Sequence, residues 1–139
     1  MNLRYHTIAS LMLFGAFSAS CQLAVNVFPP KLGADKVIVP MTMKNGFAER
    51  VESARAVCFI LDDQGKLVGQ ASRWIIGGTA DKAGLAPGAT NAFNFVVSAA
   101  KPFAASNLTA KVSFSRLILE GGKLADPQKA VTVSSAAPK

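Results

Sequence analysis

The sequence predicts an all-β protein, an antiparallel β-sandwich of about seven strands. Short segments in which apolar and polar residues alternate recur along the chain. Turn residues, such as Asn45-Gly46 and Gly77-Gly78, separate these segments at intervals of about eight to twelve residues. No segment of useful length shows the helical period of apolar residues. A closed barrel is the second candidate for the fold.

Length and charge limit the functions that can be considered. The chain has 139 residues, which is room for one domain, and half of them are hydrophobic, which is enough for a core. The formal charge is +7, which favours anionic partners, and the expected partner is an envelope protein or an anionic polymer. The basic residues are scattered singly and do not alternate with aromatic residues, which argues against a nucleic-acid surface.

Residues 1–20 have the pattern of an export signal. Arg4 precedes an apolar run from Ile8 to Phe17, and small residues follow at the expected cleavage site. We therefore expect a signal peptide at 1–20, a sandwich domain at 21–133 and a disordered tail at 134–139, in a protein that is periplasmic or secreted. Cleavage would also remove His6, the only histidine in the chain.

Cys21 has two competing interpretations, which the sequence leaves open. Its position after Ala19-Ser20 resembles the lipobox of bacterial lipoproteins, which implies a lipid anchor on Cys21; Ser18 departs from the bulky aliphatic residue that this motif expects. Alternatively, Cys21 forms a disulfide with Cys58, because an oxidising compartment favours pairing of the two cysteines. Two unrelated free thiols are a third interpretation.

The first two strands are expected at 22–28 and 37–44. In the first, Leu23, Val25 and Val27 lie on one face. Pro40 lies within the second strand and cannot donate to a ladder, so it predicts an edge position or a β-bulge.

The central strand is expected at 52–61. Val57, Phe59 and Leu61 point to one side, and the residues between them are also apolar. Apolar residues on both faces predict an interior strand that is at least partly covered on each side, with Phe59 and Leu61 in the core. The turn Asp62-Asp63-Gln64-Gly65 follows, in which Gly65 supplies a positive φ.

The later strands are expected at 67–76, 91–97, 108–119 and 131–133. Trp74 is expected in the core or at its rim, and the alternative is an exposed aromatic residue that contacts a ligand. Phe93, Phe95 and Phe114 are expected in the core between the sheets. The alternation of apolar residues slips at Arg116, which predicts a bulge.

The central hairpin resembles the FxLYD domain, a small module of exported prokaryotic proteins. Phe59, Leu61 and Asp63 match the motif, while Asp62 stands where the family has Tyr. The segment Leu85 to Gly88, with Pro87-Gly88, and the placement of Asn45 are similar too. The resemblance covers about residues 37–115 and implies an immunoglobulin-like or fibronectin-III-like sandwich. It assigns no catalytic residue.

No residue cluster in the sequence points to catalysis. Without His6 the chain lacks the usual general base and the commonest transition-metal ligand, so we expect no catalytic, cofactor or metal site. Asp62 and Asp63 are expected to make a turn and not a calcium site, because no further acidic ligand lies within reach. Cys58 is expected to be a buried residue and not a nucleophile.

Two functions remain as hypotheses. The first is a non-catalytic binding or accessory module of the bacterial cell envelope, which would recognise a partner through end loops such as 77–90 or through an open sheet edge. The second is an assembly subunit that pairs through an edge strand, either 22–28 or the C-terminal strand. The oligomeric state is not predicted.

Overall fold

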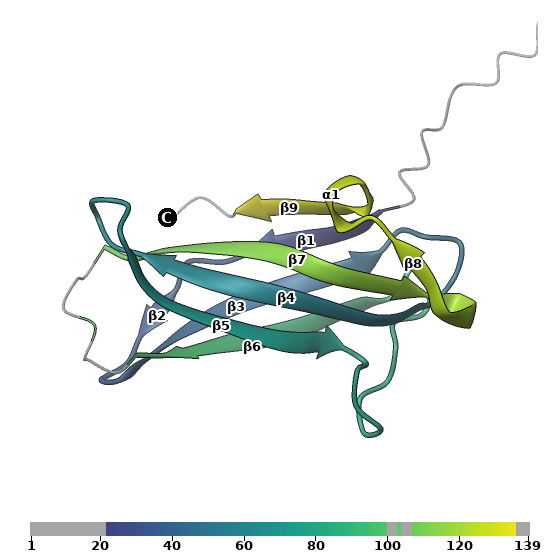
Figure 1. Ribbon diagram of the computed structural model, residues 1–139, viewed down its shortest axis with the longest axis horizontal. Coiled ribbons are helices and arrows are strands. Elements are labelled where there is room, and N and C mark those ends of the chain that lie inside the picture. Colours follow the sequence, from purple (N-terminus) through teal and green to yellow (C-terminus); the bar gives the residue numbers. More distant parts are fainter. Residues whose placement is uncertain (1–21, 100–102, 104–106, 136–139) are drawn as a thin grey trace, which may run out of the picture.

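The computed structural model describes residues 22–99, 103 and 107–135 and shows a β-sandwich of two sheets (Figure 1). The predicted fold class is confirmed. Among the described residues no ladder joins the two sheets, as a closed barrel would require. No helix of the described residues is long and apolar enough to cross a membrane. The predicted signal peptide and Cys21 lie outside the described residues.

The first sheet has five strands. They are β1 (Leu23–Val27), β2 (Lys31–Leu32), β3 (Lys36–Asn45), β6 (Thr90–Ser98) and β9 (Val131–Ser135). β3 pairs antiparallel with β6 along one side and with β1 and β2 along the other, and β1 pairs parallel with β9. β1 is therefore an interior strand, and the prediction that 22–28 is a pairing edge is wrong. β9 does lie at an edge, as the alternative prediction had it.

The second sheet has four strands in the order β5-β4-β7-β8. Its strands are β4 (Val51–Leu61), β5 (Leu67–Ile76), β7 (Thr109–Leu119) and β8 (Lys123–Ala125). A one-turn 3₁₀ helix (Glu120–Gly122) joins β7 to β8, and the short helix α1 (Pro127–Ala130) carries the chain across to β9 in the other sheet. The expected strands are all present. The structure adds two short ones, β2 and β8.

Pro40 lies in an interior strand, so the expected edge position is wrong. The N–H of Phe28 donates to the carbonyl oxygen of Pro40 at 2.9 Å, which places the backbone polar groups of Pro40 on the β1 side of β3. At this point the strand that pairs with β3 changes. β1 ends opposite Met41, and β2 begins opposite Ile38. The missing N–H of proline therefore points into the gap between β1 and β2, and the ladder to β6 loses no hydrogen bond.

The core lies between the sheets and is built from alternate residues of each strand. Leu23, Met41, Met43 and Phe95 are at most 1% exposed, and Phe93 packs edge-on against Phe95 with ring centroids 5.6 Å apart. The predicted bulge in β7 is confirmed, because the register with β4 shifts beside Arg116. The predicted core role of Phe95 and Phe114 is confirmed, since both are buried and Phe93 packs against the core.

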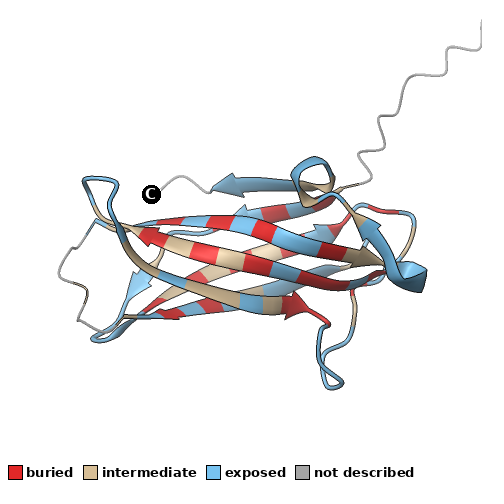
Figure 2. Cartoon of the chain, in the orientation of Figure 1, coloured by how far each residue is buried: buried red, intermediate tan, exposed pale blue. Residues whose placement is uncertain are grey.

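β4 contradicts one prediction. Ala54, Ala56, Cys58 and Ile60 face the core and are fully buried. The other face of β4 is half-buried and does not belong to the core cluster, so the placement of Phe59 and Leu61 in the core is wrong (Figure 2). β4 is interior within its sheet, but no second layer covers its outer face among the described residues.

Candidate functional site

The central turn is built by Asp62. Its carboxylate accepts hydrogen bonds from the N–H groups of Gln64 and Lys66, at 2.9 and 2.8 Å, and Gly65 has φ 79°. The predicted turn and the role of Gly65 are confirmed. Asp63 is exposed, so the residue that stabilises the turn is Asp62, which is the position that departs from the family motif.

Asn45 joins the end of β3 to the loop that carries Pro87-Gly88. The side-chain amide is buried and donates to the carbonyl oxygens of Glu49 and Leu85, both at 2.9 Å, while its oxygen accepts from Phe47 N–H at 2.8 Å. The N–H of Gly88, which has φ 75°, donates to the backbone carbonyl of Asn45 at 2.8 Å. Asn45 and the segment Leu85–Gly88, the two features that resemble the FxLYD domain outside its motif, therefore hold the end of β3 against this loop.

The outer face of the four-stranded sheet carries an apolar stripe along β4. The residues of this stripe are Val57, Phe59 and Leu61, and all three are half-buried. Residues that are paired across neighbouring strands share one side of the sheet, so the register gives their neighbours. Phe59 lies between Gln70 and Lys111. Leu61 pairs with Leu67, which extends the apolar stripe to the exposed end of β5.

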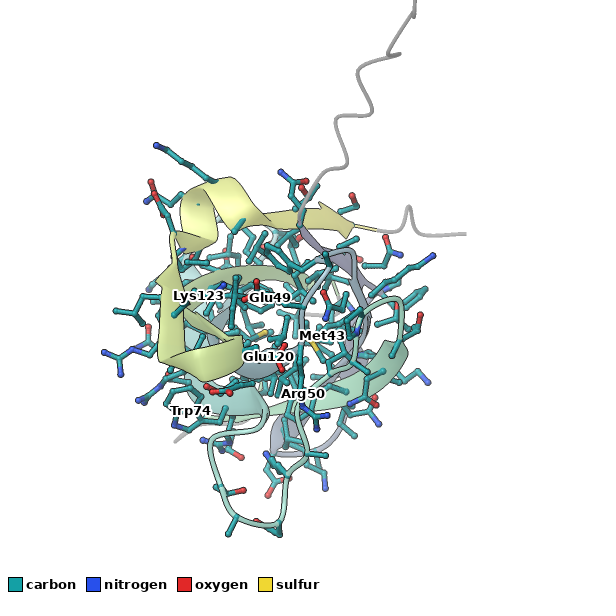
Figure 3. All side chains as sticks on the ribbon, turned by 90° about the vertical axis from the view of Figure 1, so that its right-hand side faces the viewer. Met43, Glu49, Arg50, Trp74, Glu120 and Lys123 are labelled. Carbon is teal, nitrogen blue, oxygen red and sulfur yellow. The ribbon has the colours of Figure 1, made fainter. Side chains whose placement is uncertain are left out.

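Trp74 lies at the other end of this outer face. It pairs with Arg55, whose guanidinium carbon is 5.9 Å from the centroid of the indole ring. Arg55 Nε also donates to Ser72 Oγ at 3.0 Å, which holds the guanidinium over the sheet. A Cβ on Gly78 would lie 2.4 Å from the Trp74 ring, so glycine is required for this packing. Figure 3 shows Trp74 at the periphery, away from Met43 in the interior. Of the two expected positions of Trp74, the core is therefore excluded and the rim agrees with its half-buried side chain.

The charged residues beside the apolar stripe on this outer face are basic. Arg55 and Arg116 are paired across β4 and β7, and Lys111 lies beside Phe59. We call these three residues the cationic flank; all are exposed. Among the described residues the one ion pair joins Lys123 to Glu49, at 2.8 Å and at the end of the sandwich (Figure 3). The cationic flank therefore has no carboxylate partner within the described part of the chain.

The outer face of the five-stranded sheet has a different character. Its central strands present paired residues that are small, polar or aliphatic, and none is aromatic. These pairs are Ile38 with Val96, Pro40 with Asn94, Thr42 with Ala92 and Lys44 with Thr90. The combination of an aromatic stripe with unpaired cations thus belongs to one face of the molecule.

The loop between β5 and β6 forms a separate concavity. It has a volume of about 360 Å³ and is lined in part by Ile75, Leu85 and Phe93. Lys82 Nζ lies 5.6 Å from the centroid of Phe93 and donates to the backbone carbonyl of Trp74 at 2.9 Å, so its ammonium group is already engaged. Leu85 is buried and bridges to Val51, which anchors the second half of the loop. The second half of this loop is therefore tied to β4, most of its other residues are exposed, and its role in binding stays a prediction.

Cys58 is buried, as predicted, but it lies on the core side of β4, opposite to the face on which the sequence placed the core. Its side chain has no exposed surface, and burial raises the pKa of the thiol to about 11. A thiol with this pKa is almost entirely protonated at neutral pH, so it is a poor nucleophile. Cys21 lies outside the described residues, so its lipidation and its pairing with Cys58 stay predictions.

The described residues contain no group of three or more His, Cys, Asp or Glu side chains that could hold a metal ion. Asp62 is occupied by backbone N–H groups, and Asp63 points away into solvent. The outer face offers aromatic, aliphatic and cationic groups, which are suited to non-covalent contact with a partner.

Sequence reasoning missed the outer face because it placed Phe59 in the core. One signal was available. Ala54, Ala56 and Cys58 are small, as expected where a strand packs closely beneath a second sheet, whereas Phe59 and Leu61 share their face of the strand with the charged residue Arg55. The cross-strand neighbours that reveal the cationic flank depend on register, which the single sequence does not contain.

No protein-family model matches the chain, and no curated protein matches it. Among solved structures, it is similar to the "Putative ApaA Protein from Bordetella pertussis", with 16% identity and a TM-score of 0.54, over 75% of this chain and 85% of that one. It also matches the Northeast Structural Genomics Consortium target SoR45, with 11% identity and a TM-score of 0.47, over 80% of this chain and 84% of that one. The first likeness shows the sandwich fold, and the fold alone.

Proposed function

We propose that this protein is a non-catalytic binding module, exported to the bacterial cell envelope, and that its ligand surface is the outer face of the four-stranded sheet. The observation that carries the proposal is the position of Phe59. It lies half-buried on the solvent side of a central strand, between Val57 and Leu61. An aromatic and aliphatic stripe on a solvent-facing sheet marks an interaction surface.

The composition of this face favours a protein with an acidic surface as the partner. Trp, Phe and Arg are the residue types that contribute most to protein interfaces, and Trp74, Phe59 and Arg55 lie on the same face here. The cationic flank would pair with carboxylates around an apolar patch on the partner, which would favour correct partners and speed association. The export signal predicted at 1–20 and the FxLYD resemblance support an envelope location.

Affinity capture tests the proposal. Tagged residues 21–139 are incubated with envelope extract, and the proteins retained by the unaltered domain are compared with those retained by the Phe59→Ser variant. We expect Phe59→Ser to lose the retained partner, since the variant removes the centre of the apolar stripe. Thr42→Arg on the other sheet is the matched control and should retain it. A partner retained equally by Phe59→Ser, or lost from Thr42→Arg alone, would contradict the proposal.

A second candidate function is assembly through a sheet edge. One observation favours it: β9 lies at the edge of the five-stranded sheet, and its residues Val131–Ser135 carry no charge. Uncharged edges lack one of the usual protections against strand pairing. Light scattering tests this, since assembly through β9 predicts a mass that rises with concentration and a monomer after Val133→Lys.

A further inference from the structure

One edge of β7 lacks a partner strand along most of its length. On one side β7 pairs with β4 from end to end, but on the other β8 pairs only with Leu117–Leu119. Figure 1 shows β8 confined to one end of β7. No described residue pairs with Thr109–Arg116 on that side, so the backbone N–H and C=O groups along this edge have no ladder partner in the described part of the chain.

A groove runs between this free edge and β9 in the opposite sheet. Near α1 it has a volume of about 230 Å³. The residues that line this part are Val112, Ser113, Phe114, Pro127, Gln128, Val131 and Val133. A second, separate hollow of about 200 Å³ lies at the other end of β7, where Leu108 and Ala110 line it. Two hollows therefore lie beside the free edge.

The core is less completely closed here than elsewhere. The core-facing residues Ala110, Val112 and Phe114 of β7 are 7%, 9% and 8% exposed, whereas Ala56 and Cys58 on β4 are 0% exposed. An added strand would cover the apolar residues that the sandwich leaves partly open.

We propose that the free edge of β7 accepts an extended segment of another protein as an additional strand. In this segment apolar residues alternate with acidic ones. The apolar side chains would enter the groove against Val112 and Phe114, and the acidic ones would lie on the outer face beside Lys111 and Arg116. Backbone hydrogen bonds supply affinity in strand addition, and alternate side chains supply specificity. Opposite charges directly across a pair of strands stabilise it.

The charges disfavour the other occupants of this edge. Residues 1–21 and 136–139 contain no Asp or Glu, so the termini of this chain do not have the required alternation. A second copy that paired β7 with β7 would bring two sets of Lys111 and Arg116 onto one face of the joined sheet, and the register that pairs 111 with 116 would set like charges opposite each other, which is destabilising. A foreign acidic strand avoids both problems.

Amide hydrogen exchange with synthetic peptides tests the proposal. The probe is a peptide of about eight residues that alternates valine with glutamate, a length typical of a strand; its control alternates valine with lysine. We expect saturable binding of the glutamate peptide, with slower exchange at alternate amides of Thr109–Arg116. No binding, equal binding of both peptides, or protection confined to β9 would overturn the proposal.

Charge-reversal variants make the test specific. We expect Lys111→Glu and Arg116→Glu each to weaken binding of the glutamate peptide by about five- to tenfold and to strengthen binding of the lysine peptide. Lys44→Glu, an exposed reversal on the other sheet, should change neither affinity. Unchanged affinities in Lys111→Glu and Arg116→Glu would contradict the proposal. Phe59→Ser should bind the peptide normally, so this result is separate from the fate of the proposed outer-face partner.

Discussion

At the scale of single residues, Asn45 shows how one buried polar side chain fixes two loops. Its amide makes three hydrogen bonds, to Glu49, Leu85 and Phe47, and none of its polar atoms is left without a partner. Buried polar groups stabilise a fold only when they are satisfied in this way. The Asn before the hairpin was visible in the sequence, but its partner Leu85 lies forty positions away and could not be identified there.

We expect Asn45→Ala to lower the free energy of unfolding by about 2–4 kcal/mol, because it leaves the buried N–H of Phe47 without a partner and removes the hydrogen bonds to the carbonyl oxygens of Glu49 and Leu85. Urea unfolding of residues 21–139 measures this. The control is Asn94→Ala, an exposed residue of β6, which should change stability by no more than about 0.5 kcal/mol. Similar losses in the two variants would show that the hydrogen bonds of Asn45 are not structural.

Cys58 makes stability depend on pH in the alkaline range. Burial raises its pKa in the folded state from 9.0 to about 11, so the folded protein favours the neutral thiol. This stabilisation is fully present below pH 9, where the thiol is protonated in both states, and is lost as the pH rises to about 11. The loss should reach about 2–3 kcal/mol.

The measurement is urea unfolding at several pH values, from pH 8 to pH 11, in the Cys21→Ser variant, which keeps Cys58 as a thiol. The control protein carries Cys58→Ala in addition to Cys21→Ser. Because other groups also titrate in alkaline solution, only the extra loss of unfolding free energy in the protein that keeps Cys58 is assigned to this thiol. Parallel pH dependences of the two proteins would contradict the assignment.

At the scale of elements, β4 shows what sequence patterns can and cannot give. The strands at 22–28, 37–44 and 91–97 have one apolar face each, and there the alternation correctly identified the side that faces the core. β4 is apolar on both faces, so its pattern does not say which side is covered. The small residues Ala54 and Ala56 face the other sheet, and Phe59 faces outward.

Two alanine variants separate these faces. We expect Phe95→Ala to cost about 3–5 kcal/mol, because it empties a fully buried site. Phe59→Ala should cost only about 1 kcal/mol, because its side chain is half-buried outside the core. Chemical unfolding of both variants measures the difference. Equal losses would mean that Phe59 belongs to the core after all.

At the scale of the whole molecule, the two sheets leave one side incompletely closed and one outer face apolar. The fold class and most strands followed from the alternation of residues, since each strand is locally encoded. The open edge of β7 could not be predicted from this alternation, because it depends on how far β8 extends along β7. The cationic flank could not be predicted either, since Arg55, Arg116 and Lys111 come together only through the register of β4 and β7.

Site-specific cross-linking in the cell tests most directly the claim that the outer face of the four-stranded sheet binds a partner. A photo-reactive amino acid is placed in turn at Phe59 and at Ile38, which lies on the outer face of the other sheet. Irradiation of intact cells, followed by detection of the protein, shows which face has a partner. We predict a discrete cross-linked product from position 59 and none from position 38. A product from position 38 alone, or from neither position, would contradict the claim.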